Sequence, residues 1–230
     1  TNMNMEFSTF LSNLFDYEKS VAVSSGTDGC INACFSLYDL KNAKRNVSEV
    51  IVPALSFIAT SNSVRAAGLV PKFVDIKKET LNIDEEKIED AINENTVAIM
   101  LVHTMGRMAE MDAICNIAKK HNLLVIEDAC EAHGAKFKDK FVGHWGDMSI
   151  YSFYVAHLVC SGEGGMISTN RKDIARLLTS TRSHGRPFDS LYFDHQRSGL
   201  NSKMNDLEAS IGLEAVEVFW DTFWTRHASM

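Results

Sequence analysis

The sequence contains 230 residues, of which 45% are hydrophobic and 23% are charged, a composition typical of globular proteins and unlike that of disordered ones. The formal net charge is −7 and no run of basic residues is longer than two, which argues against a nucleic-acid-binding surface. The longest apolar stretches, such as VAIMLV at 97–102, are far too short to cross a bilayer.

Apolar residues recur at helix or strand spacing along the first 130 residues. The expected elements, in chain order, are an amphipathic helix over 5–19 within an N-terminal segment 1–20, a strand and a glycine turn over 20–29, a helix that includes Ile31, a strand over 49–53, a helix over 56–68, a strand over 70–76, a helix over 84–92, a strand over 97–103, a helix over 111–122 and a strand over 123–129. Such alternation is typical of βαβ units with a mostly parallel sheet and helices on both faces.

The pattern changes after residue 135. Shorter strands are expected over 136–143, 148–154 and 164–169, followed by two helices over about 171–184 and 203–219. No internal repeat, low-complexity tract or linker is evident in the sequence, so one main domain is the economical interpretation.

Ligands in doubly wound sheets bind beyond the carboxyl ends of the strands, so the segments that follow strands are the first candidates for a site. Four such segments carry polar residues: SSGTDG (24–29), IEDACEAHG (126–134), SFYVAHLVCSGEGG (152–165) and GLNSKMNDLEA (199–209). The first is a glycine turn that enters a helix, where free amides and the helix dipole favour a phosphate. Because the pattern G-x-G-x-x-G is absent, an NAD-type oxidoreductase is disfavoured.

Each segment also has an ordinary structural explanation. The glycine turn can be a simple tight turn, and Asp128 or Glu131 can cap the segment after its strand. A lone histidine such as His157 is more often structural than catalytic, and Asn201 or Ser202 can cap the last helix. Taken one at a time, the segments leave the function open.

The order and spacing of the segments are more informative than any one of them. From about residue 20 to residue 219, the sequence resembles the large domain of the fold-type-I, pyridoxal-phosphate-dependent sugar aminotransferases of the DegT–StrS family. The stretches that carry the resemblance are AVSSGTDG, VIVPALSFIATSNSV, LLVIEDACEAHGA, VGHWGDMSIYSFYVAH, GEGGMIST and GLNSKMNDLEASIGL.

The resemblance implies a three-layer α/β large domain over 1–219, with a mostly parallel central sheet and helices on both faces. Members of the family continue into a C-terminal small domain. The segment 220–230 is therefore expected to be a linker or the beginning of that domain, cut short, and the start at Thr1 agrees with a partial sequence.

The resemblance also implies an activity. Members of the family act on nucleotide-linked keto-sugars in deoxy- or amino-sugar biosynthesis for cell-surface polysaccharides. They use pyridoxal 5′-phosphate or pyridoxamine 5′-phosphate, with glutamate as the amino donor. They are homodimers whose sites are built from both subunits.

Four residues are implied to hold the cofactor phosphate. Thr27 and Asp28 lie in the glycine turn, where they would offer backbone and side-chain hydrogen bonds. Ser152 would add a further contact. Asn201 would reach the phosphate from the neighbouring subunit.

Three residues are implied to surround the cofactor ring. Phe57 would stack on the pyridine, and Asp128 would pair with its nitrogen. A carboxylate at that position keeps the ring protonated, so that the ring can withdraw electrons. Glu131 lies where relatives have a glutamine or a glutamate near the cofactor hydroxyl.

His157 departs from the pattern of the aminotransferases. They carry a lysine, which binds the cofactor covalently, five residues before the first glycine of GEGG. An imidazole forms no stable Schiff base, whereas it accepts and donates protons near neutral pH. The nearest lysines in the sequence, Lys140 and Lys172, lie outside the motif.

A histidine at this position resembles the 3-dehydratases of the family, which carry PAHH where this sequence has VAHL. In those enzymes the histidine assists the loss of the 3-hydroxyl group of a 4-keto sugar. The sequence therefore favours 3-dehydration of a 4-keto-6-deoxy sugar, with His157 as the catalytic base. Two alternatives stay open: glutamate-dependent transamination of a keto-sugar, and a non-catalytic relative that binds a sugar nucleotide or a partner subunit.

The number and spacing of the cysteines bear on the cellular compartment and on whether the protein binds a metal. Their number is odd and no C-x-x-C spacing occurs, which favours free thiols in a reducing compartment over disulfides, a zinc site or an iron–sulfur cluster. No secretory segment opens the sequence. The expectation is a cytoplasmic protein with no metal and with no nucleic-acid or membrane partner.

Overall fold

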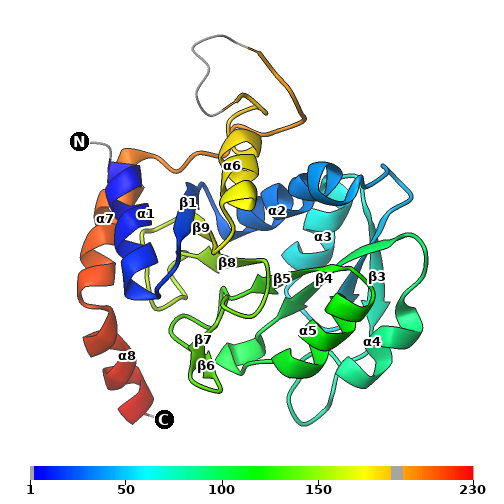
Figure 1. The fold of residues 1–230 in the computed structure, drawn as a ribbon. Helices are drawn as coiled ribbons and strands as arrows, with labels where there is room; N and C mark the ends of the chain where they lie inside the picture. The colour runs from blue at the N-terminus through cyan, green and yellow to red at the C-terminus, as the bar shows by residue number, and fades with distance from the viewer. Residues whose placement is uncertain (1–2, 188–193, 230) are drawn as a thin grey trace.

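The computed structural model describes residues 3–187 and 194–229, and Figure 1 shows their arrangement. In chain order the elements are α1 (Met3–Leu14), β1 (Lys19–Val23), α2 (Gly26–Lys41), β2 (Glu49–Pro53), α3 (Ala59–Ala66), β3 (Val70–Val74), α4 (Glu85–Ala91), β4 (Thr96–Val102), the 3₁₀ turn η1 (Thr104–Gly106), α5 (Met111–Lys120), β5 (Leu124–Asp128), β6 (Lys136–Phe137), β7 (Lys140–Phe141), β8 (Met148–Ser152), β9 (Gly165–Thr169), α6 (Lys172–Thr181), α7 (Asp206–Glu217) and α8 (Phe219–Ala228). No helix within these ranges is long and apolar enough to span a membrane.

A seven-stranded sheet forms the centre of the fold, with the strand order β1-β9-β8-β5-β4-β2-β3. Strands β3, β2, β4, β5 and β8 run parallel, whereas β9 is antiparallel to both of its neighbours. The carboxyl ends of the parallel strands therefore meet at one edge of the sheet, where α/β proteins bind their ligands. Strands β6 and β7 form a separate hairpin between β5 and β8.

Helices cover both faces of the sheet, because successive strand residues point to opposite faces. Val52 and Met100 face a core closed by α2, α3 and α6. Their neighbours Ile51 and Leu101 face the opposite core, which α4 and α5 close. Helices α1 and α7 lie side by side over β1, β8 and β9, where they bury Tyr151 (Figure 1). The expected three-layer fold with a mostly parallel sheet is confirmed.

The ends of two helices differ from the sequence-based expectation. The helix expected over 5–19 ends at Leu14, because Asp16 adopts a left-handed backbone (φ 60°) and the chain turns into β1. The helix expected over 56–68 begins only at Ala59. The residues between β2 and α3 therefore remain a loop at the carboxyl edge of the sheet.

Residues 219–228 form α8, which the sequence did not predict as a helix. The ring of Phe219 is fully buried and packs against Gly134, where an added Cβ would lie 2.9 Å from the ring. The first turn of α8 is thus part of the packed core. The division of the chain into 1–219 and 220–230 stays a prediction.

The carboxylate of Glu127, the next-to-last residue of β5, is fully buried and collects four hydrogen bonds. Its Oε2 accepts from Nε2 of His103 at 2.9 Å and from the amide of Gly143 at 2.8 Å. Its Oε1 accepts from the amides of Trp145 at 3.2 Å and Gly146 at 2.5 Å. One carboxylate thereby joins the end of β4 to the loop that leads into β8.

His103 completes this contact. Its Nδ1 accepts the amide of Ala109 at 3.2 Å, so the hydrogen donated to Glu127 must be carried on Nε2. Its own amide donates to the carbonyl of Asp128 at 3.1 Å. The pair therefore also holds the end of β5, where Asp128 lies.

We expect Glu127→Gln to lower the free energy of unfolding by about 3 kcal/mol, because the buried donors lose their charged acceptor and meet an amide donor. Urea denaturation measures the effect. The matched control is Glu94→Gln at an exposed carboxylate, which should change stability by less than about 0.5 kcal/mol. Equal midpoints for the two variants would contradict the structural role of Glu127.

Candidate functional site

The first turn of α2 presents free backbone amides at the carboxyl edge of the sheet. Ser25 caps the helix by accepting the amide of Asp28 at 3.0 Å. In the described ranges, the amides of Gly26 and Thr27 have no acceptor, as the geometry of a helix start requires. Together with the helix dipole, these amides can hold a phosphate.

Asp28 is committed to the turn itself. Its amide donates to Ser25 and its carboxylate accepts the hydroxyl of Ser24. A carboxylate offers no donor to a phosphate. The phosphate contact implied for Asp28 remains a prediction. In the structure, the hydrogen bonds of Asp28 to Ser24 and Ser25 stabilise the loop.

Two glycines let the turn approach the neighbouring strands. A Cβ on Gly26 would lie 2.7 Å from Cβ of Ser152 and 3.1 Å from Sγ of Cys130. A Cβ on Gly165 would lie 2.5 Å from the carbonyl of Ser25. The start of α2 therefore touches the segments that follow β5 and β8, which places Ser152 beside it.

Asp128 ends β5 and is nearly buried. One of its oxygens accepts the amide of Cys130 at 3.1 Å. Burial raises the pKa of the Asp128 carboxyl, which the hydrogen bonds from Cys130 partly offset. A buried carboxylate of this kind is stabilised by a protonated nitrogen placed beside it.

His157 lies half-buried on the loop between β8 and β9, with its amide bonded to the carbonyl of Tyr154 at 3.0 Å. Burial lowers the pKa of the His157 imidazole, while the charges of Glu131 and Asp128 act in the opposite direction. The three side chains are thus close enough to interact. The net lowering keeps His157 neutral at neutral pH, the state in which an imidazole accepts a proton.

His133 packs beside His157, with ring centroids 5.8 Å apart. It is buried, and its Nδ1 accepts the amide of Val159 at 3.3 Å. Burial is the main cause that lowers its pKa to about 3, and the nearby charge of His157 adds to the effect. His133 is therefore neutral and anchors the loop that carries His157.

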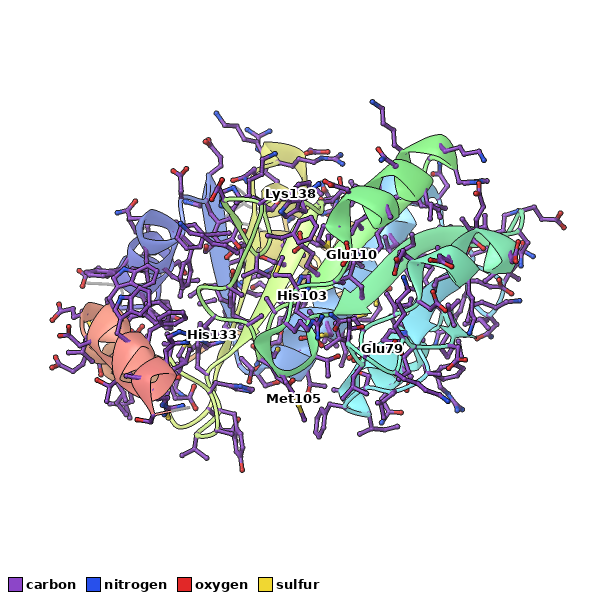
Figure 2. The ribbon with its side chains drawn as sticks, turned by 90° about the horizontal axis from the view of Figure 1, so that it is seen from below. Glu79, His103, Met105, Glu110, His133 and Lys138 are labelled. Atoms are coloured by element: carbon purple, nitrogen blue, oxygen red, sulfur yellow. The ribbon has the colours of Figure 1, made fainter. Side chains whose placement is uncertain are left out.

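His157, Glu131 and Cys130 line one cavity of about 760 Å³. Its walls come from the loop after β4, the segment after β5, the loop after β8 and the end of α8. Figure 2 shows Met105 on the loop after β4 and His133 between that loop and the C-terminal helices. Of the three residues that the sequence predicted for the cofactor ring, Glu131 lines this cavity, whereas Phe57 and Asp128 do not.

Phe57 and Asn201 stand apart from the other predicted residues. The side chain of Phe57 is 75% exposed on the loop after β2, and Asn201 is also exposed. Among the described residues, neither makes a hydrogen bond or ring contact with the other six. The carbonyl of Ser202 accepts the amide of Ser24 at 2.9 Å, so the Asn201 segment lies along the start of α2.

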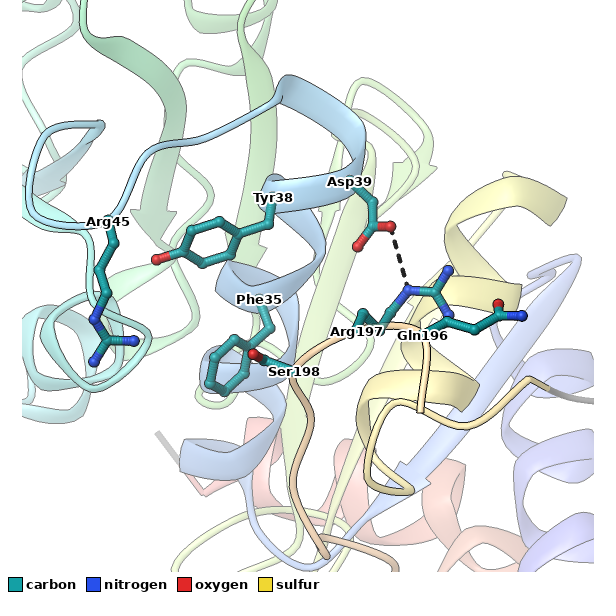
Figure 3. A pocket seen from close by; sticks show the side chains of 7 residues that line it. All are labelled: Phe35, Tyr38, Asp39, Arg45, Gln196, Arg197 and Ser198. Carbon is teal, nitrogen blue, oxygen red and sulfur yellow. Dashed lines mark hydrogen bonds and ion pairs between the residues drawn. The ribbon is translucent and has the colours of Figure 1, made fainter. Parts of the chain in front are cut away.

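A second cavity, of about 380 Å³, lies near the other end of α2 (Figure 3). Its lining includes Tyr38, Arg45 and an ion pair of 3.3 Å between Asp39 and Arg197. None of the residues predicted for the site lines it. It therefore plays no part in the candidate site.

Sequence reasoning did not identify three basic residues of the larger cavity, Arg107, Lys136 and Arg226. They lie on three different elements, and no short motif connects them. Lys136 is of special interest, because the sequence pointed only to Lys140 and Lys172 as lysines near the motif. The fold brings Lys136 into the cavity of His157 through the β6–β7 hairpin.

Comparisons with known proteins identify the family of the chain. The family model described as "DegT/DnrJ/EryC1/StrS aminotransferase family" matches residues 2–229. The chain is 43% identical over 169 residues to the GDP-perosamine synthase of Caulobacter vibrioides, covering 74% of this chain and 45% of that protein. It is 33% identical over 220 residues to the GDP-4-keto-6-deoxy-D-mannose 3-dehydratase of Yersinia pseudotuberculosis, covering 88% of this chain and 56% of that protein.

Solved structures share the fold. The structure of NtdA from Bacillus subtilis with bound cofactor PMP matches with a TM-score of 0.87 and 35% sequence identity, covering 95% of this chain and 48% of that one. The chain spans about half the length of these relatives.

The pH dependence of stability should reveal His133. Its pKa is about 3 in the folded chain, against an ordinary value of about 6.5 in the unfolded chain. Between these values the unfolded chain binds one more proton, so acidification destabilises the fold. We expect His133 to account for about 2 kcal/mol of the stability lost between pH 6.5 and pH 4.5. In urea titrations over this pH range, the free energy of unfolding of His133→Gln should fall by about 2 kcal/mol less than that of the unmodified protein. Equal decreases would contradict the low pKa of His133.

The titration of His157 should depend on Glu131. We expect its imidazole to titrate below the ordinary value of about 6.5, and Glu131→Gln to lower the pKa further by removing a stabilising negative charge. NMR of the ring protons over a pH series measures both. Glu110→Gln, at an exposed carboxylate with no side-chain hydrogen bond to its helix, serves as the control and should leave the titration unchanged.

Proposed function

The chain belongs to the DegT/DnrJ/EryC1/StrS aminotransferase family, and from that premise we propose that it binds pyridoxal 5′-phosphate or pyridoxamine 5′-phosphate and modifies a nucleotide-linked keto-sugar. Its best-supported reaction is the 3-dehydration of a 4-keto-6-deoxy sugar. The observation that carries this choice is the neutral, half-buried imidazole of His157 in the site cavity.

The residues of the site fit the cofactor. The unpaired amides of Gly26 and Thr27 suit its phosphate, with Ser152 beside them. The buried carboxylate of Asp128 suits a protonated ring nitrogen. The exposed ring of Phe57 is free to stack on an aromatic group. When bound, the cofactor supplies an electron-withdrawing ring.

His157 is the group available for proton transfer. Its neutral ring nitrogen can accept a proton, and the imidazolium can then donate a proton to the departing 3-hydroxyl group, which leaves as water. Glu131 and Asp128 stabilise the imidazolium, since their charges raise its pKa. His133 holds the loop by its bond to the amide of Val159.

A second reaction, transamination with glutamate as the amino donor, is favoured by a different observation. The 43% identity is to a protein named GDP-perosamine synthase, and Lys136 places an amine in the same cavity as His157. A non-catalytic role in binding a sugar nucleotide is the remaining alternative.

The proposal extends to assembly and location. A homodimer in which Asn201 of one subunit reaches the cofactor of the other is supported by the exposure of Asn201 and Phe57. A cytoplasmic location is supported by the five cysteines, all free thiols in the described residues.

The test is to incubate the protein with pyridoxamine phosphate, glutamate and a GDP- or dTDP-linked 4-keto-6-deoxy sugar, and to identify products by mass. We expect a 3-deoxy product from the unmodified protein. His157→Asn should form this product at least about 100-fold more slowly, and His157→Lys should form a 4-amino product.

A 4-amino product from the unmodified protein would establish transamination instead. If Lys136→Gln then abolishes transamination while the cofactor is retained, Lys136 is identified as the amine that takes part. Absorbance of retained cofactor, measured on every variant, shows whether a loss of product reflects a loss of binding.

A further inference from the structure

A short turn after β4, residues 104–107, lies against the segment that carries Glu131. The amide of Met105 donates to Oε2 of Glu131 at 2.5 Å. Gly106 packs on the same residue, since an added Cβ would lie 3.1 Å from the carbonyl oxygen of Glu131. The 104–107 turn therefore holds the carboxylate of Glu131 in the cavity that it shares with His157.

The backbone of this turn is strained. Met105 adopts a left-handed conformation (φ 54°), which residues with a Cβ rarely occupy. Its side chain is 83% exposed, so packing of that side chain does not compensate for the strain. Such a conformation persists only where the surroundings of the turn enforce it.

The side chain of Asn82 supplies two hydrogen bonds that do so. Asn82 lies on the loop between β3 and α4 and is buried. Its Oδ1 accepts the amide of Thr104 at 2.9 Å, and its Nδ2 donates to the carbonyl of Arg107 at 2.9 Å. A single side-chain amide thus bonds the first and the last residue of the turn.

The remaining bonds of the turn are local. The amide of Gly106 donates to the carbonyl of His103 at 3.1 Å, and the amide of Arg107 donates to the carbonyl of Thr104 at 3.0 Å. Among the described residues, no side chain other than that of Asn82 bonds two backbone groups of the 104–107 turn. The position of the turn against Glu131 therefore depends on Asn82.

Titratable groups from several elements surround His157. The negative charges of Glu131 and Asp128 raise the pKa of its imidazole, against the larger effect of burial. Asp128 belongs to β5 itself, so Glu131 is the one of these two carboxylates that the 104–107 turn holds. The other titratable groups that line the cavity are Arg107, Cys130, His133, Lys136, Arg226 and His227.

We propose that Asn82 is a positioning residue for the reaction at His157, because it fixes the 104–107 turn and the turn holds the carboxylate of Glu131 beside that histidine. The inference rests on the proposed function, in which His157 accepts a proton and then donates one to the departing hydroxyl group. Asn82 does not line the cavity. It acts through Glu131, whose negative charge stabilises the imidazolium that must form during the reaction.

NMR titration of His157 tests the positioning role and needs no substrate. Asn82→Ala releases the turn, so the pKa of the His157 imidazole should fall, as it should with Glu131→Gln. In the Glu131→Gln background, Asn82→Ala should cause no further shift, because the charge that it positions is already absent. Asn82→Ser keeps a polar group at the buried position and should give a smaller fall, which decides the question if Asn82→Ala does not fold.

The matched control is Asn93→Ala. The side chain of Asn93 also stabilises a loop, since it donates to Glu49 at 2.8 Å and accepts the amide of Asn95 at 2.8 Å. That loop precedes β4, whereas the 104–107 turn follows it. Because the two loops lie at opposite ends of the strand, the control should leave the titration of His157 unchanged.

Turnover supplies a second measurement. With pyridoxamine phosphate and a GDP- or dTDP-linked 4-keto-6-deoxy sugar, Asn82→Ala should lower kcat for the 3-deoxy product about tenfold and change KM little. The acidic limb of the pH profile of kcat should also move to lower pH, because a base with a lower pKa stays neutral in more acidic solution. A merely structural role of Asn82 would reduce the amount of folded protein and leave this profile in place.

The outcomes separate this inference from the proposed function. An unchanged or raised pKa of His157 in folded Asn82→Ala, a further fall in the Glu131→Gln background, or an unchanged pH profile of kcat would each overturn the positioning role. If the expected pKa shifts occur and the unmodified protein forms a 4-amino product, the proposed dehydration is refuted, whereas the positioning of Glu131 by Asn82 is supported.

Discussion

The site depends on two adjacent carboxylates at the end of β5. Glu127 is buried as a structural hydrogen-bond acceptor, and Asp128 is presented to the site. Glu127 and Asp128 are adjacent in β5, so their side chains point to opposite faces of the sheet. Glu127 collects the amides of the 143–146 loop and the imidazole of His103. Asp128 faces the start of α2, and among the described residues its carboxylate is hydrogen-bonded by Cys130 alone. Four hydrogen bonds satisfy the acceptors of the first carboxylate, whereas the second keeps acceptor capacity that a ligand can use.

The parallel topology explains why these groups converge. Parallel strands end at one edge, so the turn before α2 and the segments after β4, β5 and β8 are neighbours although they are distant in the sequence. Close approach then requires residues without a side chain. Gly26 and Gly165 meet this need, since a Cβ on either would lie within 2.7 Å of its neighbours. Gly26, which suggested a phosphate turn in the sequence, thus also determines how tightly the turn packs against Ser152.

The sequence predicted the parts of the fold that short-range patterns encode. Strands and helices follow apolar periodicity, and their order implied the parallel sheet. The left-handed backbone of Asp16, which ends α1 early, leaves no such signal. The role of Glu127 was also hidden, because its partner His103 follows a different strand, β4. Likewise, Arg107, Lys136 and Arg226 share a cavity only after β4, the β6–β7 hairpin and α8 have packed. A motif search detects residues close in sequence, whereas this charge pattern exists only in three dimensions.

The same cavity combines two requirements that oppose each other. A base must be neutral to accept a proton, whereas the imidazolium that results must be stabilised until it gives the proton up. Burial lowers the pKa of His157, while Glu131 and Asp128 limit the lowering. His133, kept neutral by its own burial, adds packing without adding charge. The protonation of His157 is therefore set by a balance between its burial, which favours the neutral imidazole, and the two carboxylates, which favour the imidazolium.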